Sequence, residues 1–379
     1  MPKTIYLDNG AATPLDKEVL EVMQPFLSDL YFNPSATYLP AKKVRNALDE
    51  ARKKVAYWLG AKAQEIIFTA GATEANNLAI KGVMDRFPDG NMVLSQLEHE
   101  SVIEPAKQYN HKFIKVDNQG LIDCGDLRKK IDDNTVLVSI MLANNEIGTV
   151  QSFSVINKVL NEIRLVRKNS KPLYFHSDCA QAGNYLDLHA ARLKVDLLSL
   201  NGGKLYGPKQ SGCLFVKNSL QLKPLIVGGG QEYGLRSGTE NVAGIIGFSY
   251  ALDKAQTLKR NEAKRLKQLQ SYFIENLGQK CPSAQVNGSI KQRLPNNVHI
   301  TLPATDNETT LLKLEQKGIL AAAGSACSAS SEEPSHVLKA IGVSQKHSRS
   351  SIRFTLGRNT TLNDIKTTLK FLTEITKVN

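Results

Sequence analysis

Short apolar runs alternate with stretches of helical spacing through much of the chain. The runs are rich in Val, Ile, Leu and Phe, which indicates buried strands, and residues 155–167 read as a helix between two of them. Strands that alternate with helices form an open, mostly parallel sheet with helices on its faces. We therefore predict the α/β fold class. The predicted strands are residues 65–69, 91–95, 113–116, 136–141, 173–177, 196–200 and 212–216.

Polar residues stand at or just beyond the ends of several of these strands. An open parallel sheet binds its ligands at the carboxyl ends of its strands. Taken singly, each residue has an ordinary explanation, because a lone histidine is more often structural and a lone aspartate is more often a helix N-cap. Their coincidence at strand ends favours a ligand site. The residues are His99, Asn145, Asp178, Gln181 and Lys204.

Lys204 follows two glycines that end a predicted strand, in the sequence Asn201-Gly-Gly-Lys204. Small neighbours let a bulky planar group approach the backbone at such a turn. An amine held there can form a Schiff base with an aldehyde. In isolation the motif is more often a surface lysine in a turn, so its meaning depends on the residues around it.

A strand, a small-residue turn and a helix start follow one another at residues 65–81. Backbone N–H groups and the hydroxyl of Thr73 could bind a phosphate there, although Thr73 could also be a simple N-cap. With Lys204 for an imine and Asp178 to keep a ring nitrogen protonated, the chain carries the parts of a pyridoxal phosphate site. His99 could stack on the ring, and an amide could address its phenolic oxygen.

Composition and charge exclude several other classes of protein. The chain has 379 residues, of which 41% are hydrophobic and 22% charged, so we expect a globular protein rather than a disordered one. No apolar run reaches about 18 residues and the start lacks a signal peptide pattern, so we expect a cytoplasmic protein. The net charge of +12 is most simply a solvated helix surface; docking of an acidic protein or RNA is the alternative.

The five cysteines are widely spaced without a CxxC pair, which argues against a disulfide framework or a zinc site. Cys327 lies in a run of small residues, 321–331, which suits a mobile loop carrying a nucleophile; a buried small-residue turn is the plain alternative. Arg353 lies in an apolar strand and suits bidentate capture of a carboxylate. Asn33, in an Asn-Pro-Ser turn, could also reach a substrate carboxylate.

A long basic helix predicted from about residue 244 to 277 reads as a connector between two domains. We predict a large cofactor-binding domain at residues 15–255. The small domain comprises residues 1–14 and 256–379 and carries the cysteine loop.

These motifs resemble the group I, IscS/NifS-type cysteine desulfurases of the class V aminotransferase family, and the likeness covers essentially the whole chain. That family has PLP fold type I, which implies a large domain with a mostly parallel, seven-stranded sheet and a smaller α/β C-terminal domain. The matching segments are residues 6–9, 33–35, 68–74, 98–99, 144–148, 178–181, 204–209, 228–232, 236–241, 324–327 and 353–355.

The resemblance implies roles for the residues around the cofactor ring. Lys204 is the Schiff-base lysine, and His99 stacks on the ring and shuttles protons. Asp178 pairs with the pyridine nitrogen. Gln181 and Asn145 address the ring oxygen and the substrate side.

The phosphate site departs from the family pattern. Ala72 and Thr73 match the family's phosphate-binding positions, and Thr239 matches a residue that reaches the phosphate of the other subunit, which implies a homodimer. The family usually has Ser-x-His-Lys before the imine, whereas Asn201 and Gly203 stand at those positions here. We expect a site that binds the phosphate without that histidine. Tyr233 and Tyr38 are further departures, from an arginine and a histidine.

For the substrate, the resemblance implies that Arg353 and Asn33 hold the cysteine carboxylate and that Cys327 attacks its sulfur. The expected activity is conversion of L-cysteine to L-alanine, with an enzyme persulfide for sulfur transfer. The acceptor would be an iron–sulfur scaffold or a tRNA-thiolation relay, with no metal, membrane or direct nucleic acid partner. A selenocysteine lyase-like enzyme and a non-catalytic scaffold derived from the family are the alternatives.

Overall fold

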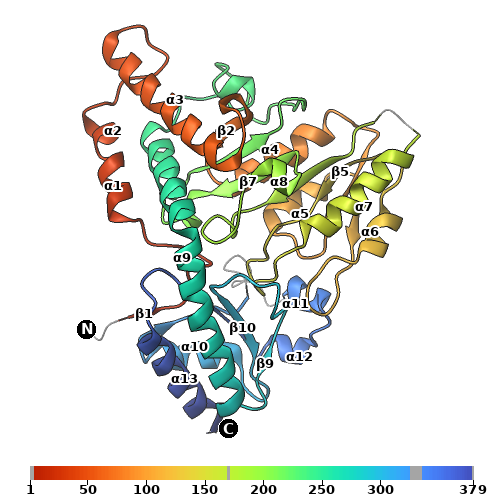
Figure 1. Ribbon diagram of the computed structural model, residues 1–379, viewed down its shortest axis with the longest axis vertical. Helices are drawn as coiled ribbons and strands as arrows, with labels where there is room; N and C mark the ends of the chain where they lie inside the picture. The colour runs from red at the N-terminus through yellow and green to blue at the C-terminus, as the bar shows by residue number, and fades with distance from the viewer. Residues whose placement is uncertain (1–3, 169–170, 325–334, 378–379) are drawn as a thin grey trace.

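The computed structural model describes residues 4–168, 171–324 and 335–377 (Figure 1). A seven-stranded sheet forms the centre of a large lobe, with the strand order β2-β8-β7-β6-β5-β3-β4. Neighbouring strands are parallel except at β8, which is antiparallel to both β2 and β7. The predicted fold class is thereby confirmed. The strands are β2 (Ile66–Thr69), β3 (Asn91–Ser95), β4 (His111–Ile114), β5 (Thr135–Ser139), β6 (Tyr174–Asp178), β7 (Leu197–Asn201) and β8 (Gly212–Val216).

Alternate residues of these strands pack into two different cores, as the period of a β-strand requires. Ile67 and Leu214 face α4 (Ala72–Met84) and α5 (Glu100–Ala106). Phe68 and Phe215 face the opposite core. That core is covered by α3 (Leu39–Leu59), α6 (Cys124–Lys130), α7 (Phe153–Val166) and the first half of α9 (Val242–Lys280). The buried sheet with helices on both faces explains why its strands read as continuous apolar runs.

α3 ends at Leu59, and Gly60 is its C-cap residue. Gly60 has a φ of 58°, and a Cβ there would lie 2.1 Å from the ring of His189. Only glycine fits this left-handed position against a neighbouring ring.

A small lobe lies at the other end of the molecule (Figure 1). Its sheet has the antiparallel order β12-β10-β9, and the N-terminal strand β1 pairs with β11 in parallel. Among the residues that the structure describes, four further helices and the second half of α9 complete this lobe. The elements are β1 (Ile5–Tyr6), β9 (Gln285–Val286), β10 (Asn297–Thr301), β11 (Ile319–Leu320), β12 (Ser351–Thr355), α10 (Asn307–Glu315), α11 (His336–Ala340), α12 (Gln345–Ser348) and α13 (Leu362–Lys377).

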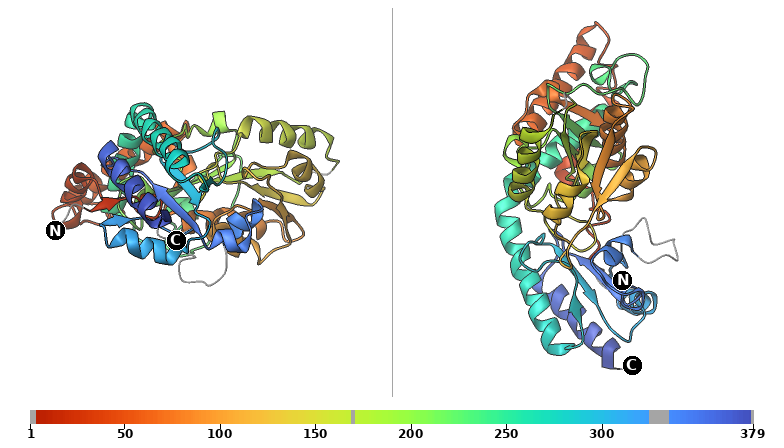
Figure 2. Two further views of the ribbon diagram at one scale, coloured as in Figure 1. Left: turned by 90° about the horizontal axis from the view of Figure 1, so that it is seen from below. Right: turned by 90° about the vertical axis from the view of Figure 1, so that its right-hand side faces the viewer.

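The long helix α9 belongs to both lobes and runs along one side of the molecule (Figure 2). Phe248 and Leu252 in its first half pack into the core of the large lobe. Leu266 and Phe273 in its second half pack into the core of the small lobe. The helix is therefore shared by two hydrophobic cores, and the exact domain boundary stays a prediction.

Short helices complete the chain: α1 (Lys17–Met23) and α2 (Pro25–Ser28) precede α3, and α8 (Ala190–Leu193) precedes β7. Within the described residues, every helix is too short or too polar to cross a membrane.

A buried histidine predicts how the fold responds to acid. His176 in β6 is fully buried between the hydroxyls of Ser139 (2.8 Å) and Ser199 (3.1 Å). Burial lowers the pKa of His176 from 6.5 to about 4, although the Asp178 carboxylate offsets part of the shift. The unfolded chain therefore binds this proton first as the pH falls from 6.5 towards 4, and the folded state loses stability in that window.

We expect the stability advantage of the wild type over His176→Gln to shrink by about 2 kcal/mol between pH 7 and pH 5. Urea unfolding of both proteins at the two pH values measures this difference. An advantage that stays constant or grows on acidification would contradict the assignment of a neutral, buried imidazole.

Candidate active site

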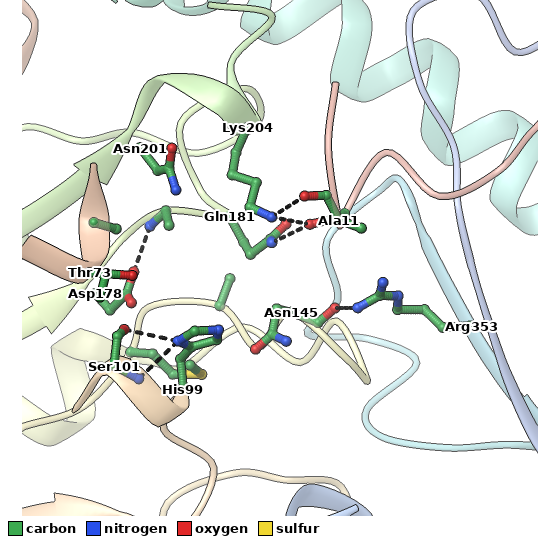
Figure 3. A pocket seen from close by; sticks show the side chains of 15 residues that line it. Ala11, Thr73, His99, Ser101, Asn145, Asp178, Gln181, Asn201, Lys204 and Arg353 are labelled. Carbon is green, nitrogen blue, oxygen red and sulfur yellow. Dashed lines mark hydrogen bonds between the residues drawn. The ribbon is translucent and has the colours of Figure 1, made fainter. Parts of the chain in front are cut away.

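A cavity opens at the edge of the large sheet where the parallel strands have their carboxyl ends (Figure 3). Its polar residues come from the ends of β6 and β7, from the segments that follow β3, β5, β6 and β7, and from the first turns of α4 and α5. The small lobe supplies one arginine. Nine of the predicted site residues line this one cavity: Ala72, Thr73, His99, Asn145, Asp178, Gln181, Asn201, Lys204 and Arg353.

Lys204 ends a single 3-10 turn, Gly202–Lys204, that follows β7. Its amine donates hydrogen bonds to the carbonyl oxygens of Gly10 (2.9 Å) and Ala11. The amide of Gln181 also donates to the Gly10 carbonyl, at 3.0 Å. The loop after β1 thus lies directly against the lysine (Figure 3). The sequence leaves the role of this loop open, and the structure makes it a wall of the site.

Asp178 is the last residue of β6, and its side chain lines the cavity. Only 6% of the residue's surface is exposed. One carboxylate oxygen accepts the backbone N–H of Ala180 at 2.8 Å. The other accepts the amide of Asn76, in α4, also at 2.8 Å. Two donors therefore fix the orientation of the carboxylate and satisfy both of its oxygens in a buried place.

The start of α4 provides a cradle for an anion beside this cavity. Gly71 precedes the helix with a φ of 120°, and no described side chain caps the helix start. The first N–H groups of this 13-residue helix therefore lack side-chain acceptors, and they carry the positive end of the helix dipole. Thr73, Asn201, Gly203 and Lys209 line an adjoining recess of about 730 Å³.

Arg353 reaches the cavity from β12 in the small lobe and is only 1% exposed. It donates to the backbone carbonyl of Asn145 at 3.0 Å and forms an ion pair with Asp8 at 2.7 Å. Its Nε is buried without a partner among the described residues. The guanidinium therefore joins the N-terminal loop, the large lobe and the small lobe, and Nε remains as a donor for a ligand.

His99 is the N-cap residue of α5, and its Nδ1 accepts the backbone N–H of Ser101 at 3.1 Å. The preceding residue, Glu98, is fully buried and accepts the N–H of Met141 at 2.7 Å. Burial raises the pKa of Glu98 well above its usual range. Glu98 thus fixes the segment that carries His99 against the segment after β5.

Two predicted site residues in the described part of the chain lie away from this cavity. Asn33 is exposed, and its side-chain oxygen accepts the N–H of Ser35 at 2.9 Å. Thr239 lines a different pocket, beside Arg236. Cys327 lies outside the described residues. The roles of these three residues stay predictions, and Gly203 lines the recess next to the cavity rather than the cavity itself.

Comparisons with known proteins identify the family. A model described as aminotransferase class-V matches residues 5–368. The chain therefore belongs to the class-V aminotransferase family. It is 41% identical over 382 residues to "Cysteine desulfurase IscS" of Dictyoglomus turgidum, an alignment that covers 99% of this chain and 95% of the relative. It is 40% identical to the protein of the same name from Methanosarcina thermophila, with 98% and 92% covered.

Solved structures agree with this assignment. A NifS-like protein from Rickettsia africae is 31% identical and superposes with a TM-score of 0.89, covering 99% of this chain and 100% of that one. The structure of SspA in complex with cysteine is 35% identical, with a TM-score of 0.80 and coverage of 93% and 99%. The family and the fold class predicted from the sequence motifs are confirmed.

Two neighbouring glycines before Lys204 predict opposite responses to a side chain. A Cβ at Gly202 would lie 2.2 Å from the Ser211 hydroxyl oxygen, whereas the nearest atom to a Cβ at Gly203 is 3.4 Å away, on Asn201. We expect Gly202→Ala to cost about 1–3 kcal/mol of stability through overpacking. Gly203→Ala should change stability by no more than about 0.5 kcal/mol.

Chemical denaturation of the two variants beside the wild type measures these costs. A Gly203→Ala variant as unstable as Gly202→Ala would show that the recess does not have the room described.

Proposed function

We propose that this chain is a pyridoxal-phosphate-dependent cysteine desulfurase, which converts L-cysteine to L-alanine and takes up the sulfur as a persulfide. The observation that carries the proposal is that Lys204, Asp178 and the start of α4 meet at one cavity. An amine, a buried carboxylate and a helix start suit the aldehyde, ring nitrogen and phosphate of this cofactor. Relatives named cysteine desulfurase, at 41% and 40% identity, support the same activity.

The residues present fit the cofactor. Lys204 would hold its aldehyde, and Asp178 would face its ring nitrogen with the orientation that Asn76 and Ala180 already fix. When bound, pyridoxal phosphate supplies an electron sink next to the substrate's amino carbon. A carboxylate that two donors hold in place beside the ring nitrogen can keep that nitrogen protonated, which that chemistry requires.

Phosphate binding rests on the recess beside α4. Thr73 and the first N–H groups of the helix would donate to the phosphate, as would Asn201. Lys209 lines the same recess, with its Cγ 3.5 Å from the place of a Cβ on Gly203. Its ammonium can supply positive charge where the family usually has a histidine.

Substrate binding rests on Arg353 and Asn145, which line the cavity and are hydrogen-bonded to each other. The free Nε of Arg353 can donate to the carboxylate of cysteine, and the ion pair with Asp8 fixes the plane of the guanidinium. Asn33 would join the carboxylate from a neighbouring subunit or after a local rearrangement. His99, on the other side of the cavity, can move protons at the reacting carbon.

Sulfur transfer is assigned to Cys327 from its place in the sequence and from the state of the other cysteines. Burial raises the pKa of the Cys179 and Cys213 thiols, which keeps them protonated and unreactive. Cys281 is buried, and burial also raises the pKa of the half-buried Cys124. Each of these four thiols is thus a poor nucleophile or is shielded from a substrate.

The overall reaction balances without an outside oxidant. An S–S bond forms between the Cys327 sulfur and the substrate sulfur, and the substrate C–S bond breaks with its electron pair left on carbon. Carbon takes a proton and becomes the methyl group of alanine. Carbon is reduced and sulfur is oxidised, and the thiol of Cys327 becomes a persulfide.

The proposal extends to a homodimer. Three aromatic side chains gather before α3, where Tyr31 stacks on Phe32 and Phe32 meets Tyr38 edge-on. Tyr31 and Tyr38 are exposed. Leu39 beside them is 74% exposed. Such a patch is suited to burial against a second copy, and a second copy could also bring Thr239 to the phosphate.

We further propose a cytoplasmic location and an iron–sulfur scaffold or a tRNA-thiolation relay as the sulfur acceptor.

Product analysis tests the activity. The protein loaded with pyridoxal phosphate is given L-cysteine and a reductant, and alanine and sulfide are quantified over time. We expect equal amounts of both products, released over many turnovers. Turnover of selenocysteine with no alanine from cysteine would favour a selenocysteine lyase, and no turnover of either would favour a scaffold.

Replacing the proposed sulfur carrier separates its role from that of the other cysteines. We expect Cys327→Ser to abolish sulfide release and to bind pyridoxal phosphate like the wild type. Cys124→Ser is the matched control, because Cys124 is partly exposed whereas the other three described cysteines are buried, and it should keep full activity. Near-normal turnover by Cys327→Ser would contradict the assignment.

The carboxylate at the ring nitrogen should matter more for catalysis than for folding. Removing one partner of a buried ion pair costs about 3 kcal/mol or more, so Asp178→Asn should lower kcat by at least about a hundredfold. Asp196→Asn is the matched control, because Asp196 pairs with Arg164 and Lys217 away from the cavity. It should lower stability and leave kcat within a few-fold of the wild type. Equal effects of the two variants on kcat would make Asp178 a structural residue.

A further inference from the structure

A buried amide behind the cavity connects two residues of the site. Asn76, on α4, is 0% exposed. Its Nδ2 donates to the Asp178 carboxylate at 2.8 Å and to the Ser101 hydroxyl oxygen at 2.9 Å. The Ser101 oxygen lies 2.9 Å from Nδ1 of His99 (Figure 3). One continuous chain of hydrogen bonds therefore runs from the aspartate to the histidine.

The chemistry of the groups fixes the direction of this chain. An ionised carboxylate can only accept, so the Asn76 side chain must turn its NH2 group towards Asp178. The same NH2 group donates to Ser101, whose own hydroxyl hydrogen is then available for Nδ1 of His99. The opposite amide orientation would set Oδ1 of Asn76 against a carboxylate oxygen.

The backbone adds a second constraint on the imidazole. The N–H of Ser101 also donates to Nδ1 of His99, at 3.1 Å. A nitrogen that accepts two hydrogen bonds cannot carry a hydrogen of its own. The neutral imidazole must therefore carry its hydrogen on Nε2, the nitrogen on the side of the ring away from Ser101.

The cost of this arrangement is visible at Asn76 itself. Its Oδ1 is buried without a partner among the described residues. An unsatisfied buried acceptor costs stability, and natural proteins keep few of them. An amide that leaves its own oxygen unpaired and serves two residues of a site fits a functional role better than a structural one.

We propose that Asn76 and Ser101 are positioning residues, which hold His99 as the Nε2–H tautomer and tie its orientation to that of Asp178. The inference rests on the proposed function for its catalytic meaning, because only then do His99 and Asp178 act on one reaction. The hydrogen bonds of the network exist in the chain whatever reaction it catalyses. The network couples the imidazole of His99 to the carboxylate of Asp178, and both groups line the same cavity.

The topology of the network predicts unequal effects of its two members. Of the two site residues, Ser101 contacts only His99 and reaches Asp178 only through Asn76, so Ser101→Ala should leave the absorbance band of the bound cofactor unchanged. It should lower kcat by about two- to tenfold, the effect of one lost hydrogen bond, with little change in KM. Asn76 contacts both branches, so Asn76→Ala should also alter that band through Asp178. Ser101→Thr, which keeps a hydroxyl, should restore most of the lost kcat.

Nuclear magnetic resonance of the imidazole nitrogens tests the network without any turnover. Protein labelled with ¹⁵N-histidine is measured with and without cofactor, and His99→Gln assigns the signal. We expect hydrogen on Nε2 only, and a shift of the Nδ1 resonance in both Ser101→Ala and Asn76→Ala. Ser139→Ala is the matched control, because it removes a similar contact from His176, at 2.8 Å, and should leave the His99 signal in place.

The two proposals fail in different ways. Hydrogen on Nδ1 of His99, or an Nδ1 signal that neither variant moves, would overturn the network whatever the activity of the protein. The expected spectra from a protein that does not desulfurate cysteine would overturn the proposed function and leave the network standing. Equal changes of the cofactor band in Ser101→Ala and Asn76→Ala would contradict the branching at Asn76.

Discussion

The buried carboxylate of Asp178 is the constraint on which the rest of the site depends. A charge with 6% exposure is costly unless donors and a counter-charge surround it. The structure supplies two donors, from Asn76 and Ala180, but neither carries a positive charge. A protonated pyridine nitrogen would supply that positive charge. The carboxylate would in turn keep the pyridine nitrogen of the cofactor protonated, so each group would stabilise the other. This reciprocity explains why β6 can end in an acid at the centre of an apolar sheet.

Two long-range contacts turn the edge of the sheet into an enclosed site. The loop after β1 belongs to the small lobe through the pairing of β1 with β11, yet its carbonyls hold the amine of Lys204. Arg353, from β12, is bound to Asn145 of the large lobe and to Asp8 of that same loop. The lobes therefore meet at the groups that would hold cofactor and substrate. Both lobes are needed for a complete site, and α9, which is packed into both cores, fixes their relation.

The sequence predicts the sheet and much of the site because both follow local rules. Strands buried on both faces give apolar runs, and polar residues after parallel strands converge on one edge. The sequence does not predict the roles of Asn76 and Ser101. Both are polar residues within helices, and the local sequence does not indicate that such a residue contacts a buried partner in another element. Gly10 and Ala11 act through backbone carbonyls, which no residue type reveals. The role expected of Thr239 depends on a contact with a second subunit, which local rules within one chain do not describe.

The location of the transferred sulfur tests the central claim most directly. The protein loaded with pyridoxal phosphate is mixed with less than one equivalent of L-cysteine and without reductant, and is then alkylated, digested and analysed by peptide mass spectrometry. We expect one extra sulfur atom on the peptide that contains Cys327, with one alanine formed for each sulfur bound. Alanine formation with the sulfur on another cysteine, or no sulfur on the protein while sulfide is released, would contradict this claim.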